Sequence, residues 1–175
     1  AENSNLSVLL LDKGNSPLKR KCPIKENGCI KCKPCNILCG IGGAGLFSDG
    51  KLNFIHKLGK TDLTQFLPEA EARLLIDETE QIFNRFGMDG KVFPTDMELA
   101  NQIRKDARKS GIDLLIIKQK HLGSDNLPAH IAGMADYIEN SGVVFHHLEE
   151  ARDIVVENGE IAGLVTDKAT YRSKN

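Results

Sequence analysis

The clearest apolar pattern near the start of the chain covers residues 5–12, a nearly continuous hydrophobic run that ends in Asp12 and a Lys13-Gly14 turn signal. A run that is apolar on both faces is typical of a strand buried in a parallel sheet. Near the other end, residues 152–157 and 160–166 flank Asn158-Gly159. Both turn residues tolerate the positive φ of a type I′ turn. We therefore expect a buried strand early in the chain and a β-hairpin late.

Helical periodicity dominates the middle of the chain. One helix is predicted to start near Asp62, with Thr61 or Asp62 as its cap and Pro68 in its first turn, and to stop at Gly87. The Thr95 to Glu98 spacing matches a capping box and predicts a second helix ending at residue 111. A third is expected over residues 128–141. Short apolar runs at 112–117 and 143–147 predict strands, so the expected fold class is α/β in the mixed α+β sense.

Residues 16–60 are predicted to be irregular, because Gly, Pro, Cys and Lys dominate and neither a helical nor a strand-like apolar periodicity persists. Irregular stretches of that length inside a compact domain usually serve a function. The last residues, 169–175, are polar and predict no anchored element.

Composition removes several classes of function. Lys and Arg number 23 against 24 acidic residues, a formal net charge of -1, so no global field favours nucleic acid or an anionic membrane. No apolar run approaches the roughly 20 residues of a membrane span, and the polar start does not resemble a signal peptide. We expect a cytoplasmic protein that acts on a small-molecule substrate, with no nucleic-acid or membrane partner.

All five cysteines lie between Cys22 and Cys39, unlike a disulfide framework spread through a secreted domain. Three interpretations stay open: a metal site, reduced structural thiols, or redox-active thiols. A metal site would be an iron-sulfur cluster or zinc, because the cysteine spacing reproduces a bacterial cluster run apart from Gly40 at its usual proline. Its ligands would be Cys29, Cys32, Cys35 and Cys39, with Cys22 as a further candidate.

Two other segments carry candidate chemistry. Asp12 stands where an acid of a dinucleotide fold accepts hydrogen bonds from ribose hydroxyls, although a plain turn acid is the alternative. Gly40, Gly42 and Gly45 have G-x-G-x-x-G spacing, but Ser48-Asp49-Gly50 would break the helix that this motif needs. We reject the tract as the pyrophosphate turn; it is either a close-approach loop for a flat or anionic ligand or merely flexible.

The five histidines give weaker signals. His121 follows an expected strand and is a candidate catalytic residue able to exchange a proton with substrate. His146 and His147 should point to opposite faces of a strand, and His56 and His130 are expected at the surface.

Several motifs together resemble a known family. Leu9-Leu-Leu-Asp12-Lys-Gly14, Cys35-Asn-Ile-Leu-Cys-Gly, Gly42-Gly-Ala-Gly-Leu-Phe-Ser-Asp-Gly-Lys-Leu52 and His121-Leu-Gly-Ser-Asp-Asn126 are similar to bacterial FAD-dependent dehydrogenases, also called NAD(FAD)-utilizing dehydrogenases. The resemblance runs nearly the length of the chain. It implies the architecture of the glutathione-reductase superfamily, with a Rossmann-like FAD domain interrupted by a second α/β domain.

The resemblance also implies roles and boundaries. Residues 1–62 and 142–175 would form part of the FAD domain, and residues 63–141 the inserted substrate domain. Asp12 would hold the adenosine ribose, Lys13 and Gly14 would shape its turn, and Ala151 would meet adenine. The residues facing flavin and pyrophosphate would be Gly42, Gly43, Ala44, Gly45, Ser48, Asp49, Gly50 and Lys51.

The family's phosphate-binding strand, turn and helix would precede residue 5, and its closing strand would follow residue 175. We therefore expect an internal fragment of an FAD-dependent oxidoreductase that binds FAD weakly or not at all by itself. The sequence leaves substrate, oligomeric state and the use of NAD(P)H as electron donor open. The alternative is a cysteine-rich iron-sulfur or zinc module on an α/β scaffold.

Overall fold

A computed structural model describes residues 5–24, 28–123 and 125–173. Its elements are mixed α and β, which confirms the expected fold class. The chain divides into two compact units, the first made of Ala1–Phe47 with Pro128–Asn175 and the second of Ser48–Leu127. The sequence had placed the second domain at 63–141. The observed second unit starts and ends earlier in the chain.

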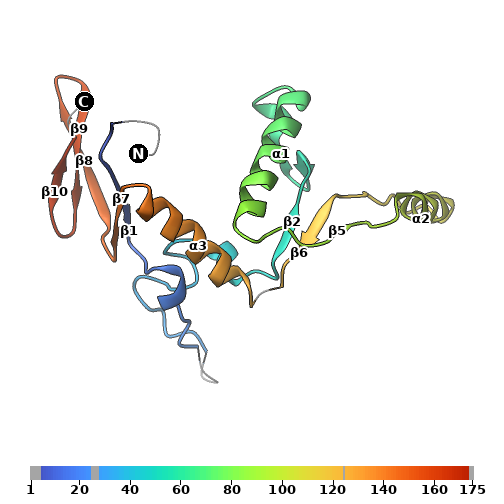
Figure 1. Cartoon of the computed structure of the whole chain (residues 1–175), viewed down its shortest axis with the longest axis horizontal. Coiled ribbons are helices and arrows are strands. Elements are labelled where there is room, and N and C mark those ends of the chain that lie inside the picture. Colours follow the sequence, from blue (N-terminus) through green and yellow to red (C-terminus); the bar gives the residue numbers. More distant parts are fainter. Residues whose placement is uncertain (1–4, 25–27, 124, 174–175) are drawn as a thin grey trace. The chain divides into compact units, whose positions relative to one another are not determined.

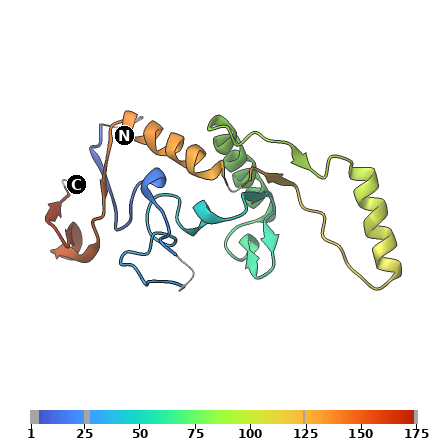
Figure 2. The same ribbon diagram turned by 90° about the horizontal axis from the view of Figure 1, so that it is seen from below.

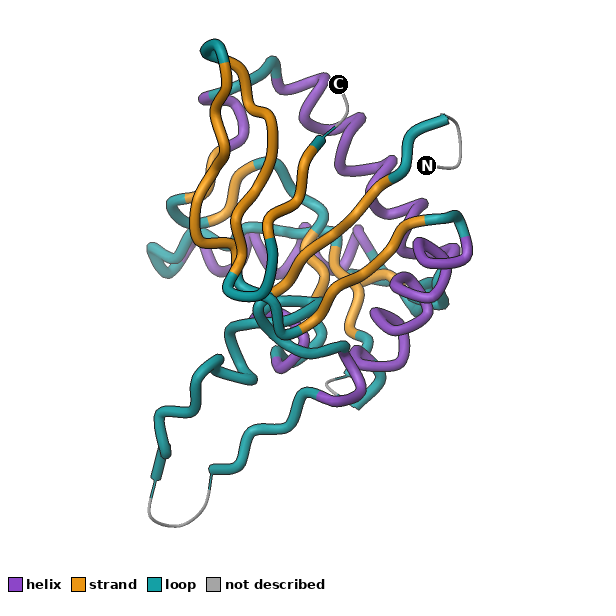
Figure 3. Tube along the Cα trace, turned by 90° about the vertical axis from the view of Figure 1, so that its left-hand side faces the viewer, coloured by secondary structure: helices purple, strands orange, loops and turns teal. Residues whose placement is uncertain are grey.

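The first unit is built on two parallel strands, β1 (Val8–Asp12) and β7 (Val143–His147), drawn side by side in Figure 3. In their register Asp12 is opposite His147, so both strands end together. The parallel pairing agrees with the expectation. The burial does not, because Leu9 and Leu10 remain 37% and 38% exposed among the described residues. Helix α3 (Leu127–Asn140) precedes β7, as predicted.

An antiparallel sheet of β8 (Ala151–Glu157), β9 (Glu160–Thr166) and β10 (Thr170–Arg172) completes this unit. Asn158 and Gly159 both have positive φ, at 53° and 84°, which confirms the predicted hairpin turn. The expectation of an unanchored tail was wrong for 170–172. Those residues pair with β9, and a strand whose stability comes from a partner carries little local signal.

The second unit contains a sheet in the order β2 (Lys51–Asn53), β6 (Gln119–His121) and β5 (Val92–Phe93). A small hairpin joins β3 (Lys57–Leu58) to β4 (Thr61–Asp62). The predicted strand at 112–117 is absent from the described chain. Only 119–121 find ladder partners in β2 and β5, and β-branched composition without a partner does not make a strand.

Two helices belong to the second unit, α1 (Glu69–Arg85) and α2 (Met97–Lys109). Both were predicted, but their caps differ. Pro68 occupies the N-cap position of α1 and makes no side-chain hydrogen bond there, and Asp62 caps the short 3-10 helix Leu63–Gln65 instead. At α2, Asp96 rather than Thr95 accepts the hydrogen bond of the Leu99 amide, at 2.9 Å. Helix α2 has no buried residue and stands away from α1 in both Figure 1 and Figure 2.

Helix α1 is joined to the sheet by buried charges. Lys120 of β6 is only 3% exposed, and its Nζ lies 3.0 Å from Glu80 Oε1 and donates to Asn84 Oδ1 at 2.6 Å. Lys118 approaches the other oxygen of the Glu80 carboxylate. Burial raises the pKa of Glu80, but the hydrogen bonds from Lys118 and Lys120 outweigh it and lower that pKa.

Segment 16–60 is largely irregular, as predicted. Its regular parts are the 3-10 helices Pro17–Lys19 and Ala44–Phe47 and the short strands β2 and β3. None of the described helices has the length and apolarity needed to cross a membrane.

Candidate functional site

The carboxyl ends of β1 and β7 are tied together by backbone hydrogen bonds. Asp12 Oδ1 accepts from the Gly14 amide at 2.7 Å and so forms the turn that the sequence suggested. The Glu149 amide donates to Asp12 O at 3.1 Å, and the Leu148 amide donates to Gly14 O at 3.0 Å. This edge of a parallel sheet is where ligands of open α/β folds bind.

The turn after β1 touches the glycine tract backbone to backbone. A Cβ built on Gly14 would lie 2.2 Å from Gly40 N, and one built on Gly40, whose φ is +108°, would lie 2.5 Å from Asn15 O. The Ile41 amide donates to the same Asn15 carbonyl at 3.3 Å. Glycine is required at both positions because any side chain would force the two segments apart.

The buried side chain of Arg20 binds the backbone of the glycine tract and of the residues before it. Its side chain is 4% exposed and donates to five backbone carbonyls, those of Asn36, Ile37, Gly40, Ile41 and Gly43. Its guanidinium also lies 5.1 Å from the centre of the Phe47 ring. Burial lowers the pKa of Arg20, against the opposing effects of Asp12, Cys39 and Cys35. These bonds give several carbonyls in and beside the tract a defined side-chain partner.

A cavity of about 700 Å³ opens between the strand ends and this tract. The residues that the resemblance assigns to the cofactor and that line it are Asp12, Lys13, Gly42, Gly43 and Ala151. Gly40 and Cys39 line it as well. Gly14 is buried beside it, and Ala44 and Gly45 begin the 3-10 helix that follows the tract. The Gly43 amide donates to Gly40 O at 3.0 Å, so this amide is already used within the tract and is not available to a phosphate.

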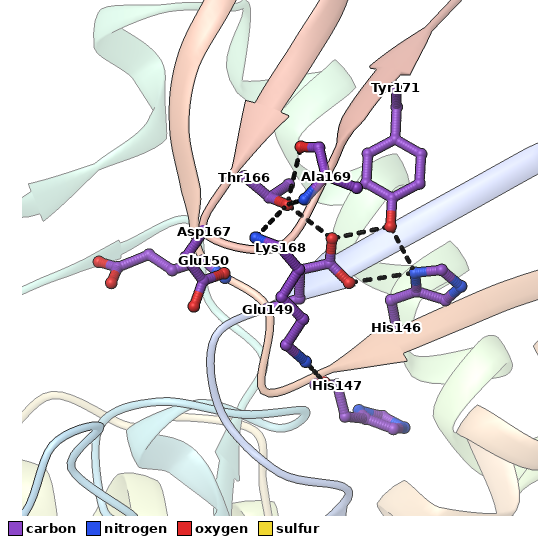
Figure 4. A network of polar contacts seen from close by, with 9 residues as sticks. All are labelled: His146, His147, Glu149, Glu150, Thr166, Asp167, Lys168, Ala169 and Tyr171. Carbon is purple, nitrogen blue, oxygen red and sulfur yellow. Dashed lines mark hydrogen bonds and ion pairs between the residues drawn. The ribbon is translucent and has the colours of Figure 1, made fainter.

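A buried carboxylate supports the same cavity from the side of the hairpin (Figure 4). Glu149 accepts hydrogen bonds from the hydroxyls of Thr166 and Tyr171 at 2.7 Å each, and His146 Nδ1 lies 3.1 Å from its second oxygen. These contacts, that of Thr166 first, lower the pKa of Glu149, and the carboxylate in turn raises the pKa of Tyr171. The network ties β7 to β9 and β10.

The two adjacent histidines point to opposite faces of β7, as predicted. His146 joins the carboxylate network, whereas His147 stacks on Phe145 with 5.8 Å between ring centres. His56 was expected at the surface, and that was wrong. Its side chain is only 14% exposed, beside Glu69 of α1.

A second cavity, of about 640 Å³, lies in the cysteine loop of the first unit. Cys32, Cys35 and Cys39 line it together with Lys13 and Arg152, while Cys22 and Cys29 are exposed. Within the described residues no group of three or more His, Cys, Asp or Glu side chains is arranged to hold a metal ion. Metal binding by Cys29, Cys32, Cys35 and Cys39 therefore gains no support from the geometry.

In the second unit, the pairing of β2 with β6 brings together the other candidate cofactor and catalytic residues, from Ser48 to Lys51 and His121. His121 Nε2 lies 2.9 Å from Asp49 O, and Lys51 is opposite His121 in the ladder. Ser48 Oγ accepts from the Gly50 amide at 3.2 Å. Gly50 has φ +75°, and a Cβ there would lie 2.8 Å from Gly123 O, so this close approach also requires glycine.

The candidates for flavin and substrate roles thus form two groups, apart from the cysteines. Asp12, Lys13, Gly42, Gly43 and Ala151 share a cavity in the first unit, and Ser48, Asp49, Gly50, Lys51 and His121 adjoin in the second. Their roles stay predictions. Sequence reasoning missed Arg20 and Glu149; the available signal for Arg20 was a cation beside a long irregular segment whose carbonyls lack regular partners.

No protein-family model matches the chain, and no curated protein does. Among solved structures, the L-amino acid deaminase from Proteus vulgaris is similar at 17% identity with a TM-score of 0.45. That match covers 95% of this chain, which spans 40% of the length of the deaminase chain.

Proposed function

We propose that the first unit is part of the FAD site of a flavin-dependent oxidoreductase, and that the cavity at the ends of β1 and β7 receives the adenosine half of the cofactor. One observation carries the proposal. An acid that closes a parallel strand shares a cavity with a glycine tract and with the first residue of a following strand, Asp12 with Gly42 and Ala151.

The residues present fit an adenosine better than a pyrophosphate. Asp12 uses one carboxylate oxygen for its own turn, which leaves the other to accept from a ribose hydroxyl. Lys13 supplies a cation at the cavity wall, where Glu150 Oε1 lies 3.7 Å from its Nζ. Carbonyls of the glycine tract accept hydrogen bonds from Arg20, and the Gly43 amide donates to the Gly40 carbonyl, so these groups are not available to the cofactor. Weak binding of the whole cofactor is the consequence.

In such an enzyme the flavin supplies the hydride chemistry, and the protein supplies position and electrostatics. Asp12 would orient the ribose. His121 would hold or move a proton at its ring nitrogen on the substrate side, with its Nε2 positioned by the Asp49 carbonyl. The substrate would be a small organic molecule.

The test is a titration of the chain with ADP and, separately, with FMN, followed by backbone amide shifts in NMR spectra. ADP at concentrations on the order of 10 mM should shift the amides of Asp12, Gly42 and Ala151, and FMN should not, since only ADP carries the adenosine half.

The Asp12→Asn variant keeps the oxygen that accepts from Gly14 but loses the charge, and should weaken ADP binding by roughly tenfold. Asp153→Asn is the matched control, because Asp153 also accepts a local backbone bond but lies on the exposed hairpin. Unmoved amides at the cavity, or equal affinity in Asp12→Asn and the wild type, would refute the proposal.

A further inference from the structure

We propose that Cys32 and Cys35 form a reversible dithiol and disulfide pair that exchanges electrons with a small organic disulfide entering the cavity of the cysteine loop. This inference concerns thiol chemistry and does not depend on nucleotide binding.

Spacing and contact single out this pair from the five cysteines. Cys32, Cys35 and Cys39 all line the cavity and are all partly exposed. Of these three, Cys32 and Cys35 are the two with C-x-x-C spacing, and their side chains are hydrogen-bonded to each other. Cys-x-x-Cys spacing brings two sulfurs within reach of one disulfide bond and is typical of redox-active sites. Cys29 is exposed and lies outside the cavity lining.

Cys35 occupies the position that favours a thiolate. It opens a turn in which the amides of Leu38 and Cys39 donate to its carbonyl at 3.2 and 2.9 Å. Hydrogen bonds from the amides of Leu38 and Ile37 to the sulfur lower the pKa of Cys35; burial opposes them, and the Cys32 thiol and Arg20 add to them. Because Cys35 opens this turn, with the amides of the turn directed toward it, we assign the nucleophile to Cys35 and the second, resolving thiol to Cys32.

The cavity suits a small disulfide with acidic groups. Its charged lining residues are Lys13, Lys33, Arg152, Glu150 and Asp167, with the cations in excess. Glu150 is already paired with Arg152, at 2.9 Å, and lies 3.7 Å from Lys13. Three cations against two acids leave the lining with a net positive charge, which favours a disulfide that carries a carboxylate.

The reaction balances without any further reagent. The Cys35 thiolate attacks one sulfur of the disulfide RSSR, a Cys35–SR bond forms, and RS⁻ leaves. Cys32 then gives its proton to that thiolate, and its sulfur attacks Cys35. The second RS⁻ leaves as the Cys32–Cys35 bond closes. Two electrons pass from the cysteine pair to RSSR, and the products are RSH, RS⁻ and the protein disulfide.

The experiment uses the whole chain and oxidised glutathione as the disulfide. Five free thiols should fall to three, and peptide mapping by mass spectrometry should find Cys32 joined to Cys35. Excess reduced glutathione should restore all five. Cys32→Ser should trap glutathione on Cys35, and Cys35→Ser should abolish the internal bond.

Cys29→Ser is the matched control, since it removes a neighbouring thiol from outside the cavity and should behave as the wild type. A second measurement is the alkylation of each cysteine before and after oxidation, in which Cys32 and Cys35 should become protected while Cys29 stays reactive. Glutathione held at Cys22 or Cys29, a bond between Cys35 and Cys39, no loss of thiols, or stoichiometric zinc or iron in the purified chain would each overturn the proposal.

Discussion

Among the residues that the structure describes, each unit buries one cation, and the two cations have different bonding partners. Arg20 in the first unit is 4% exposed and bonds to five backbone carbonyls. Lys120 in the second is 3% exposed and bonds to a carboxylate and a side-chain amide of one helix. The first cation supports a backbone that has no regular structure. The second joins two regular elements whose backbones are already satisfied.

The chemistry of the two cations matches these tasks. A guanidinium is a planar fork of five N–H donors, and it can serve carbonyls that approach from several directions. An ammonium is a compact point charge that suits a single carboxylate. An irregular loop that carries a binding site therefore needs the arginine, because its buried carbonyls would otherwise lack donors.

The largest effect is expected from Arg20→Lys, which keeps the charge and removes the fork. A lysine cannot reach five carbonyls, and each buried acceptor left without a donor costs about 1–3 kcal/mol. We expect a loss of about 3–5 kcal/mol in the free energy of unfolding, measured by urea denaturation, with faster amide exchange at Gly43. Arg172→Lys, at an exposed pair with Glu157, is the control and should change little. A loss as small as that of the control would show that charge alone matters at position 20.

A smaller loss should follow from Lys120→Met in the second unit. The substitution leaves buried Glu80 with Lys118 as its remaining cation. The free energy of unfolding should therefore fall by about 3 kcal/mol, the lower end of the range for removing one partner of a buried ion pair. The double variant Lys120→Met with Glu80→Leu should recover most of that loss, because no uncompensated charge then remains. A double variant no more stable than the single one would contradict this account of the ion pair.

The smallest effect concerns the Glu149 network and appears only with pH. Because the folded-state pKa of Glu149 is lowered, its stabilising contribution is present above the ordinary carboxyl value of 4.5 and is lost as pH falls through the folded pKa. Thermal melts from about pH 7 to about pH 3 should show a steeper decline in Tm for the wild type than for Glu149→Gln. If Tm falls equally with pH in the wild type and in Glu149→Gln, Glu149 does not contribute to the loss of stability in acid.

Local patterns predicted much of the fold. The hairpin around Asn158-Gly159 follows from turn chemistry that needs no distant partner, and α1, α2 and α3 follow from apolar spacing with glycine stops. The misplaced strand at 112–117 and the missed strand β10 share one cause. A strand exists where a neighbour completes its ladder, and composition alone does not reveal that neighbour.

The sequence by itself determined which residues have the chemistry to bind or react: an acid at a strand end, a glycine tract, a run of cysteines and a histidine that follows a strand. Only the tertiary structure decided which of them meet. It placed Asp12 beside Gly42 and Ala151, set Arg20 under the tract's carbonyls, and left Cys29 outside the cavity that Cys32 and Cys35 line. Contacts across such sequence separations depend on how the backbone packs, and that packing is settled by the whole set of hydrogen bonds and burial at once.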